Sequence, residues 1–82
     1  MRLDKFLKVS RLIKRRTVAN EACDAGRVEI NGKVAKAGSE VRVGDRITIR
    51  FGEKLVNAEV LVVEDNATKE AAREMIRYLN SD

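Results

Sequence analysis

Apolar residues near the start of the chain recur at the spacing of one helix face. Leu3, Phe6 and Leu7 follow an i, i+3, i+4 pattern, and the lysines among them fall on the opposite side. Leu12 would be out of phase with Leu3 if this helix continued. We therefore expect the first helix to end near residues 9–10.

A second helix is predicted over Thr17–Ala25. Thr17 is a candidate N-cap, and Gly26 is placed to end the helix because glycine tolerates the left-handed backbone found there. Cys23 falls on the apolar side of this helix, so we interpret it as a small buried hydrophobe. The apolar positions are Val18, Ala19, Ala22, Cys23 and Ala25.

Beyond Gly26 the pattern changes to the alternation of half-buried strands. Strands are predicted around residues 28–30, 47–51 and 55–64, with Phe51 in the core. Turns are predicted at Asn31-Gly32, Gly44-Asp45 and Gly52-Glu53, the first being a strong hairpin signal.

The segment Thr68–Leu79 predicts a closing helix, with Thr68 as its cap. The fold class is therefore α+β: two N-terminal helices packed on a small antiparallel sheet, with a C-terminal helix. Residues 1–51 are expected to form the core of one domain, and residues 52–82 to complete it with a strand and the closing helix. The helix's apolar face would be Ala71, Ala72, Met75, Ile76 and Leu79.

Charge is distributed unevenly along the chain, whose net charge is +4. Residues 1–16 contain seven bases and one acid, whereas residues 51–82 contain four bases and seven acids. Such asymmetry indicates a polyanionic partner that meets the N-terminal segment. Lys54 and Lys69, in the acidic third, are expected to lie outside that surface.

The sequence lacks the residues that a metal site, a nucleophilic active site or a nucleotide site would need. Without a histidine or a second cysteine, neither a zinc site nor a Cys-His nucleophile can be assembled. No phosphate-cradling glycine motif is present, so we predict no cofactor and no catalytic residue. Charges interrupt the apolar residues of the first segment, and together with the lone thiol this favours a cytoplasmic protein without a membrane partner.

Three motifs carry a resemblance to a known family: Arg2-Leu3-Asp4-Lys5-Phe6-Leu7, Arg16 opening a helix that ends at Gly26, and Gly26-Arg27-Val28-Glu29-Ile30-Asn31-Gly32. With the downstream Val41–Ile47, they resemble the S-four-type RNA-binding domain over about residues 1–51. The wider arrangement is similar to the RqcP-like bacterial ribosome-associated quality-control factors, a subgroup that also includes the fifteen-kilodalton heat-shock protein.

This resemblance implies binding to large ribosomal subunits that carry an obstructed nascent chain. The expected contacts are ribosomal RNA and the peptidyl-tRNA, in support of template-free tailing, with a nascent-chain tailing factor as a further candidate partner. The protein is expected to be a monomer. The alternative is a general structured-RNA-binding, recycling or assembly factor without a tailing role. The resemblance places the RNA-facing arginines at Arg2 and Arg16, with Asp4 between them.

The expected RNA surface combines these residues with the basic cluster around them, because lysine and arginine that hold phosphates release counterions. Asp4 has two interpretations: it orients Arg2 or Arg16 through an ion pair, or it favours the start of the first helix through the macrodipole. A direct polar contact to RNA is a third. The surface comprises Arg2, Asp4, Lys5, Lys8, Arg11, Lys14, Arg15 and Arg16.

Two other functions are weighed against RNA binding. An RNA-modifying enzyme would need a catalytic domain for which 82 residues leave no room. A DNA-binding regulator would use the first two helices, but the long basic connector at Ser10–Arg16 and the following sheet match a helix-turn-helix poorly. A non-catalytic RNA-binding factor is the preferred hypothesis.

Overall fold

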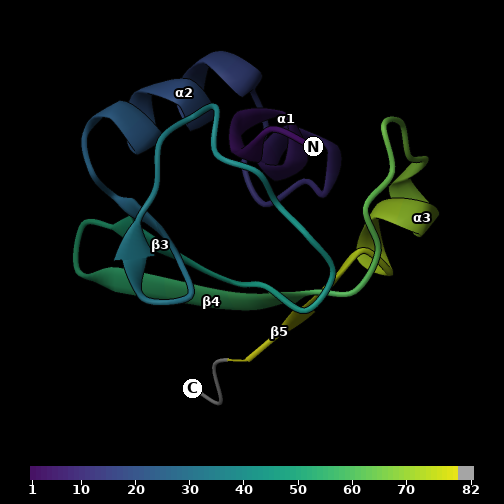
Figure 1. The fold of residues 1–82 in the computed structure, drawn as a ribbon. Coiled ribbons are helices and arrows are strands. Elements are labelled where there is room, and N and C mark those ends of the chain that lie inside the picture. The colour runs from purple at the N-terminus through teal and green to yellow at the C-terminus, as the bar shows by residue number, and fades with distance from the viewer. Residues whose placement is uncertain (80–82) are drawn as a thin grey trace.

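The computed structural model describes residues 1–79. The helices are α1 (Leu3–Val9), α2 (Arg16–Asp24) and α3 (Lys69–Arg73), and the strands are β1 (Val28–Ile30), β2 (Lys33–Val34), β3 (Arg46–Phe51), β4 (Lys54–Val60) and β5 (Ile76–Tyr78). The strands form one antiparallel sheet in the order β2-β1-β3-β4-β5. Figure 1 shows α1 and α2 together over one face of the sheet, with α3 beside its β5 end. The predicted α+β class is confirmed.

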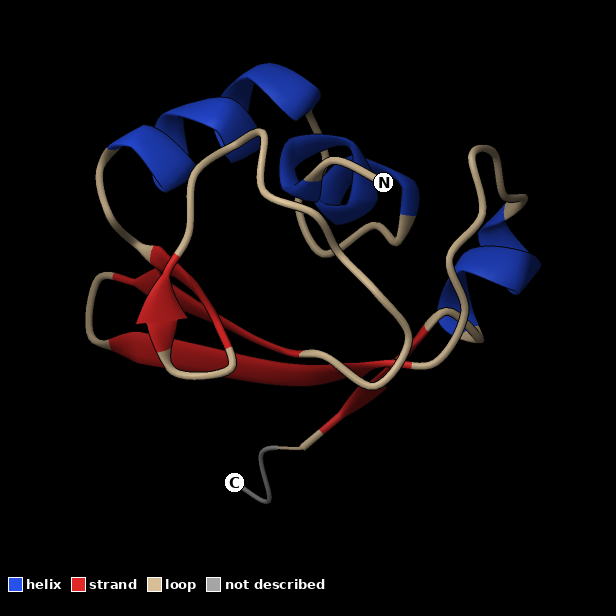
Figure 2. Ribbon diagram, viewed as in Figure 1, coloured by secondary structure: helices blue, strands red, loops and turns tan. Residues whose placement is uncertain are grey.

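The core lies between α1, α2 and the covered face of the sheet (Figure 2). Leu3, Phe6 and Leu7 have 0% exposure, as their helical spacing predicted. Ile47 and Ile49 of β3 meet this layer and are almost wholly buried. Burying one such side chain stabilises the fold by roughly 1.5–3 kcal/mol, so the apolar face of α1 fixes the helix firmly on the sheet.

Helix α2 begins one residue earlier than expected. Arg15 is its extended N-cap and makes no side-chain capping bond, while the Ala19 N–H donates to the Arg15 carbonyl at 3.0 Å. Thr17 therefore lies inside the first turn, and the prediction that it caps the helix was wrong. The helix does end before Gly26, whose φ of 73° confirms the predicted stop. Of its expected apolar side, Ala19 and Cys23 are buried and Val18 is 44% exposed.

The predicted Asn31-Gly32 hairpin joins β1 to β2. Both residues have positive φ, 53° and 84°, as a type I′ turn requires. The Asn31 side chain also reaches the predicted turn at Asp45: its Nδ2 donates to Asp45 Oδ1 at 3.1 Å, and its Oδ1 accepts from the Arg46 N–H at 2.9 Å. This side chain ties the two turns together.

Two expectations for the middle of the sheet need correction. Phe51 is 41% exposed, because it ends β3 and pairs with Lys54 where the β3–β4 hairpin leaves the core. Strand β4 ends at Val60 rather than continuing to residue 64. Beyond it, the N–H groups of Leu61 and Val62 donate to the Met75 carbonyl, so the chain turns from the sheet toward α3.

The predicted closing helix is present, but it is much shorter than expected. Thr68 does cap α3, accepting from the Ala71 N–H at 3.1 Å, but the helix ends at Arg73. Residues 76–78 form β5 against β4, with Val60 opposite Ile76 and Ala58 opposite Tyr78. The sheet edge explains this outcome, because β4 would otherwise leave ladder groups without strand partners. A helical spacing of apolar residues could not reveal that competing demand.

Candidate nucleic-acid interface

The starts of α1 and α2 meet at one carboxylate. Arg2 Nε lies 3.2 Å from Asp4 Oδ1, and Arg2 Nη2 donates to Oδ2 at 3.4 Å. Arg16 Nε lies 3.4 Å from the same Oδ2. Two guanidinium groups from different helices are thus held by Asp4, which supports the ion-pair interpretation of this residue.

Asp4 and the two arginines differ greatly in solvent exposure. The Asp4 side chain is 3% exposed, whereas those of Arg2 and Arg16 are 55% and 50% exposed. Asp4 also accepts from the Lys5 N–H at 2.8 Å and from Asn20 Nδ2 at 3.3 Å. The carboxylate therefore faces inward and is fully engaged, while both arginines present N–H donors to solvent.

The charge state of Asp4 follows from these contacts. Burial works to raise its pKa, but hydrogen bonds from Arg2, Asn20, Arg16 and the Lys5 N–H outweigh that effect. The pKa of Asp4 is consequently lower than its usual value. At neutral pH the carboxylate is ionised and orients both arginines, and the cluster keeps a net positive charge.

Backbone contacts hold Arg2 at the entrance of α1. The Leu3 N–H donates to the Ser39 carbonyl at 2.8 Å, and the Asp4 N–H donates to Ala37 at 3.1 Å. The backbone of Arg2 forms an isolated antiparallel β-bridge with Glu40. The Arg2 side chain passes close to Gly38, since its Cζ would lie 3.9 Å from a Cβ added there. The loop at 37–40 thus fixes the chain from which this arginine extends.

A second group of cations lines a hollow beside the connector that follows α1. This hollow has a volume of about 390 Å³, and its cations belong to Lys8, Arg11 and Lys14. Asn66 and Ala67 close its other side. None of these three cations pairs with an acid among residues 1–79. The hollow therefore presents uncompensated positive charge.

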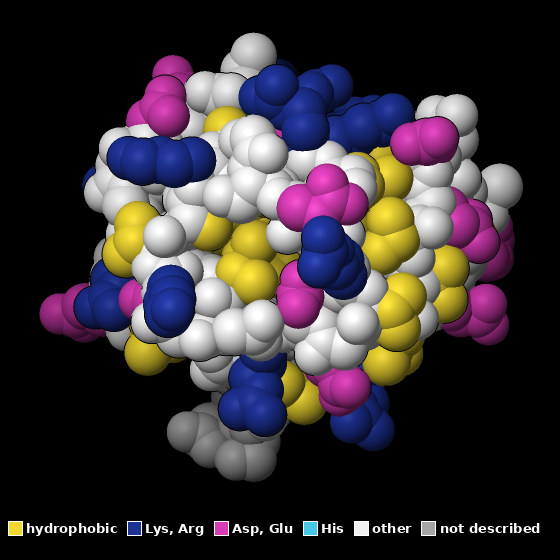
Figure 3. Space-filling view, viewed as in Figure 1, with side chains coloured by type: hydrophobic (Ala, Val, Ile, Leu, Met, Phe, Trp, Pro, Cys, Tyr) yellow, Lys and Arg dark blue, Asp and Glu magenta, His cyan; other side chains and the backbone are white. Residues whose placement is uncertain are grey.

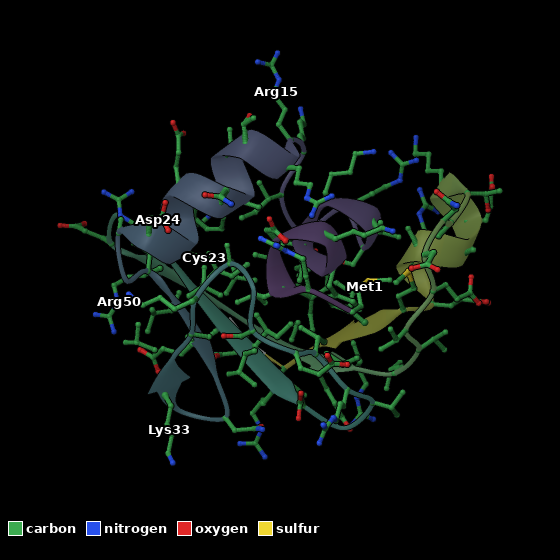
Figure 4. All side chains as sticks on the ribbon, turned by 45° about the horizontal axis from the view of Figure 1, so that its top comes forward. Met1, Arg15, Cys23, Asp24, Lys33 and Arg50 are labelled. Carbon is green, nitrogen blue, oxygen red and sulfur yellow. The ribbon has the colours of Figure 1, made fainter. Side chains whose placement is uncertain are left out.

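The remaining two predicted residues differ from each other. Arg15 points away from the ribbon into solvent at the start of α2 (Figure 4). Lys5 is more restrained, because its Nζ lies 3.3 Å from Asp65 Oδ1. In Figure 3, Lys and Arg side chains gather along the upper edge, over the two N-terminal helices. The structure thus brings most of the predicted surface onto one side.

Asn20 is the residue of this cluster that sequence reasoning missed. It lies four positions after Arg16 on the same face of α2, so it follows the arginine toward Asp4. That i, i+4 relation is visible in the sequence once Arg16 is singled out. The acid it contacts, however, comes from another helix, and only the packing of α1 on α2 reveals it.

Two kinds of reactive centre, a thiolate and a metal ion, can be checked among the described residues. Burial, followed by the nearby carboxylates of Asp4 and Asp24, raises the pKa of Cys23 to about 11, so its thiol stays protonated. Within residues 1–79 no group of three or more His, Cys, Asp or Glu side chains could hold a metal ion. The geometry is suited to binding anions through oriented guanidinium and ammonium groups.

Known proteins resemble this chain over its whole length. Residues 1–47 match the model of the S4 domain. A Bacillus subtilis protein named RQC P-site tRNA stabilizing factor is 56% identical over 82 residues, covering 100% of this chain and 95% of that protein. A protein of the same name from Halalkalibacterium halodurans is 61% identical over 72 residues, covering 88% of this chain and 82% of its own.

A solved structure extends the similarity to the fold. Vibrio cholerae heat shock protein 15, described as trimeric, superposes with a TM-score of 0.87 at 30% identity. The match covers 95% of this chain and 80% of that protein. It therefore includes the α3–β5 segment as well as the part matched by the domain model.

Proposed function

The chain belongs to the S4 domain family, in the group named RQC P-site tRNA stabilizing factor, and from this premise we propose that it binds RNA on large ribosomal subunits. Its ligands would be ribosomal RNA and the transfer RNA that carries an obstructed nascent chain. By holding that transfer RNA, the protein would support template-free tailing of the chain. It would act in the cytoplasm, as a monomer.

One observation carries the proposal: the buried carboxylate of Asp4 holds the exposed guanidinium groups of Arg2 and Arg16. A guanidinium group can donate two parallel hydrogen bonds to phosphate oxygens. Two such groups, fixed on adjacent helices by a shared acid, lose little side-chain freedom when RNA binds. The arrangement therefore favours a rigid phosphate clamp over a loose field of charge.

The surrounding cations would add affinity without base specificity. Lys8, Arg11, Lys14 and Arg15 carry no compensating acid among residues 1–79, so phosphates of structured RNA could displace their counterions. Binding on two sides of the connector would let the protein bridge ribosomal RNA and transfer RNA. The mechanism proposed is positioning, with no covalent step supplied by this chain.

The likeness to heat shock protein 15 favours a second candidate. The same clamp could serve a general structured-RNA-binding or ribosome recycling factor with no part in tailing. The two candidates share the RNA surface and differ in the ribosomal species that they select.

The test is to purify the tagged protein from cells at mild salt and identify the ribosomal species and RNAs that accompany it. The proposal predicts large subunits with peptidyl-tRNA, and tailing that fails when wild type is replaced by Arg2→Ala. Arg46→Ala is the matched control, since Arg46 is exposed and alternates with the inward Ile47 on the sheet. Recovery of subunits without peptidyl-tRNA, and tailing unaffected by Arg2→Ala, would favour the second candidate.

A further inference from the structure

A second hollow lies on the far side of Arg11, between the connector and the α3–β5 segment. Its volume is about 220 Å³. Arg11 lines both this hollow and the one described above, so the two are continuous along one basic surface. The residues that line it are Ser10, Arg11, Lys69, Ala72, Arg73, Ile76 and Tyr78, and no acid is among them.

The charges of α3 are separated onto two sides of the helix. Lys69 and Arg73 are four residues apart on one side, and Glu70 and Glu74 repeat that spacing next to them. Neither Lys69 nor Arg73 pairs with an acid among residues 1–79. Both cations instead face the hollow that already contains Arg11.

Arg11 has an unusual backbone for its type. Its φ is 65°, directly after Ser10, the C-cap of α1. This left-handed position normally carries glycine, because other residues are strained there. The Arg11 side chain extends from this turn and lines both hollows. Its guanidinium group is therefore placed where an anion in either hollow could accept hydrogen bonds from it.

The hollow also has an apolar wall with an exposed aromatic ring. Ala72 and Ile76 are 1% and 7% exposed and form a firm base, whereas Tyr78 is 62% exposed at the edge. Tyr78 is held by the pairing of β5 with β4, opposite Ala58. An exposed ring on a paired strand, beside three cations, has the features of a site that stacks a base and binds its phosphate.

We infer that this hollow binds one nucleotide of an RNA chain. Arg11, Lys69 and Arg73 would hold its phosphate, and the base would lie against the Tyr78 ring. The volume is below the 300–1,000 Å³ usual for small-molecule pockets, which suits a single unit of a longer polymer. The inference rests on the proposed function and adds α3–β5 to its RNA surface. Lys69, expected to lie outside that surface, would then be part of it.

The test measures affinity for purified large ribosomal subunits, and separately for bulk transfer RNA, across a range of salt concentrations. Arg11→Gly should weaken binding and lower the salt exponent by about one, and Lys69→Gln with Arg73→Gln should lower it by about two. Melting temperatures should change little, because Arg11→Gly relieves a positive φ and the glutamines replace exposed side chains. Misfolding is thereby excluded as the cause of weaker binding.

Tyr78 separates a nucleotide site from a bare phosphate site. Tyr78→Ala should weaken binding about tenfold with an unchanged salt exponent, since it removes stacking and no charge. Tyr78→Phe should bind like wild type. If folded Tyr78→Ala binds RNA as tightly as Tyr78→Phe, the nucleotide site is overturned.

The charge-matched control is Lys33→Gln with Lys54→Gln, two exposed lysines on β2 and β4. If the hollow variants behave like this control with both RNAs, the inference fails. Weaker binding by Arg2→Ala in the same assay would then leave the proposed function intact. If Arg2→Ala also has no effect, the proposed function fails with it.

Discussion

Asp4 Oδ2 lies 3.4 Å from Arg16 Nε and so joins the first turn of α1 to the first turn of α2. Because Asp4 is buried and also holds Arg2, the ion pair does more than cap a helix. It sets the orientation of two exposed cations relative to each other. The proposed clamp depends on this one acid.

Asp4→Asn should therefore weaken RNA binding although it makes the protein more positively charged. The amide keeps the shape of the side chain but replaces one acceptor oxygen with an NH2 donor and removes the charge, so the shared orientation of the two arginines is lost. Stability should fall by about 1–3 kcal/mol, the usual loss for hydrogen bonds to a buried charge. Denaturant unfolding and subunit binding measure the two effects. Asp65→Asn, which frees only the exposed Lys5 pair, is the control.

The stability that Asp4 contributes should depend on pH. Its folded pKa is lower than the ordinary value of 3.8, so the stabilisation is fully present above that value and is lost as pH falls through the folded pKa. Thermal melts should show a constant gap between wild type and Asp4→Asn from pH 7 to about 5. The gap should close in the acid range below 3.8. A gap independent of pH down to pH 2 would contradict the ionised state of Asp4.

Affinity for RNA should fall steeply with salt. Four to six phosphate contacts correspond to an exponent of roughly −3 to −5 for the dependence of affinity on salt concentration. Filter binding to ribosomal RNA between low and physiological salt measures it. A flat response would exclude the phosphate clamp.

Cys23→Ala should separate the fold from the site. Cys23 is fully buried, so the loss of its sulfur should cost on the order of 1 kcal/mol through packing. RNA binding by the folded protein should persist. With a pKa of about 11, the thiol of the native protein should also resist alkylation near pH 8. Loss of binding without loss of stability would reveal a role for Cys23 that packing does not supply.

The fold could be predicted from sequence where one local pattern decides the structure. Leu3, Phe6 and Leu7 gave the buried face of α1, and Asn31-Gly32 gave the hairpin, because each signal is complete within a few residues. The helix prediction around Ile76 was wrong, because the spacing of apolar residues there suits a helix while the open edge of β4 favours a strand. A short stretch of sequence carries no information about such pairing between distant strands.

The same division applies to the candidate site. The basic residues of the N-terminal segment were identifiable as a group from their density along the chain. The contact of Asn20 with Asp4 and the position of Lys69 beside Arg11 depend on how separate helices pack. Both pairs are far apart in the sequence, so no local pattern reveals them. Lys69 was also hard to identify because it belongs to a segment of net negative charge.

The central claim is that Arg2 and Arg16 form the RNA clamp, and co-sedimentation with large ribosomal subunits tests it most directly. Arg2→Ala and Arg16→Ala should keep the circular dichroism spectrum, since both side chains are half exposed and leave no core cavity. Each should bind subunits about tenfold more weakly, the equivalent of about 1.4 kcal/mol for one lost guanidinium contact. Arg46→Ala should bind like wild type. Folded Arg2 and Arg16 variants that co-sediment as well as Arg46→Ala would contradict the account.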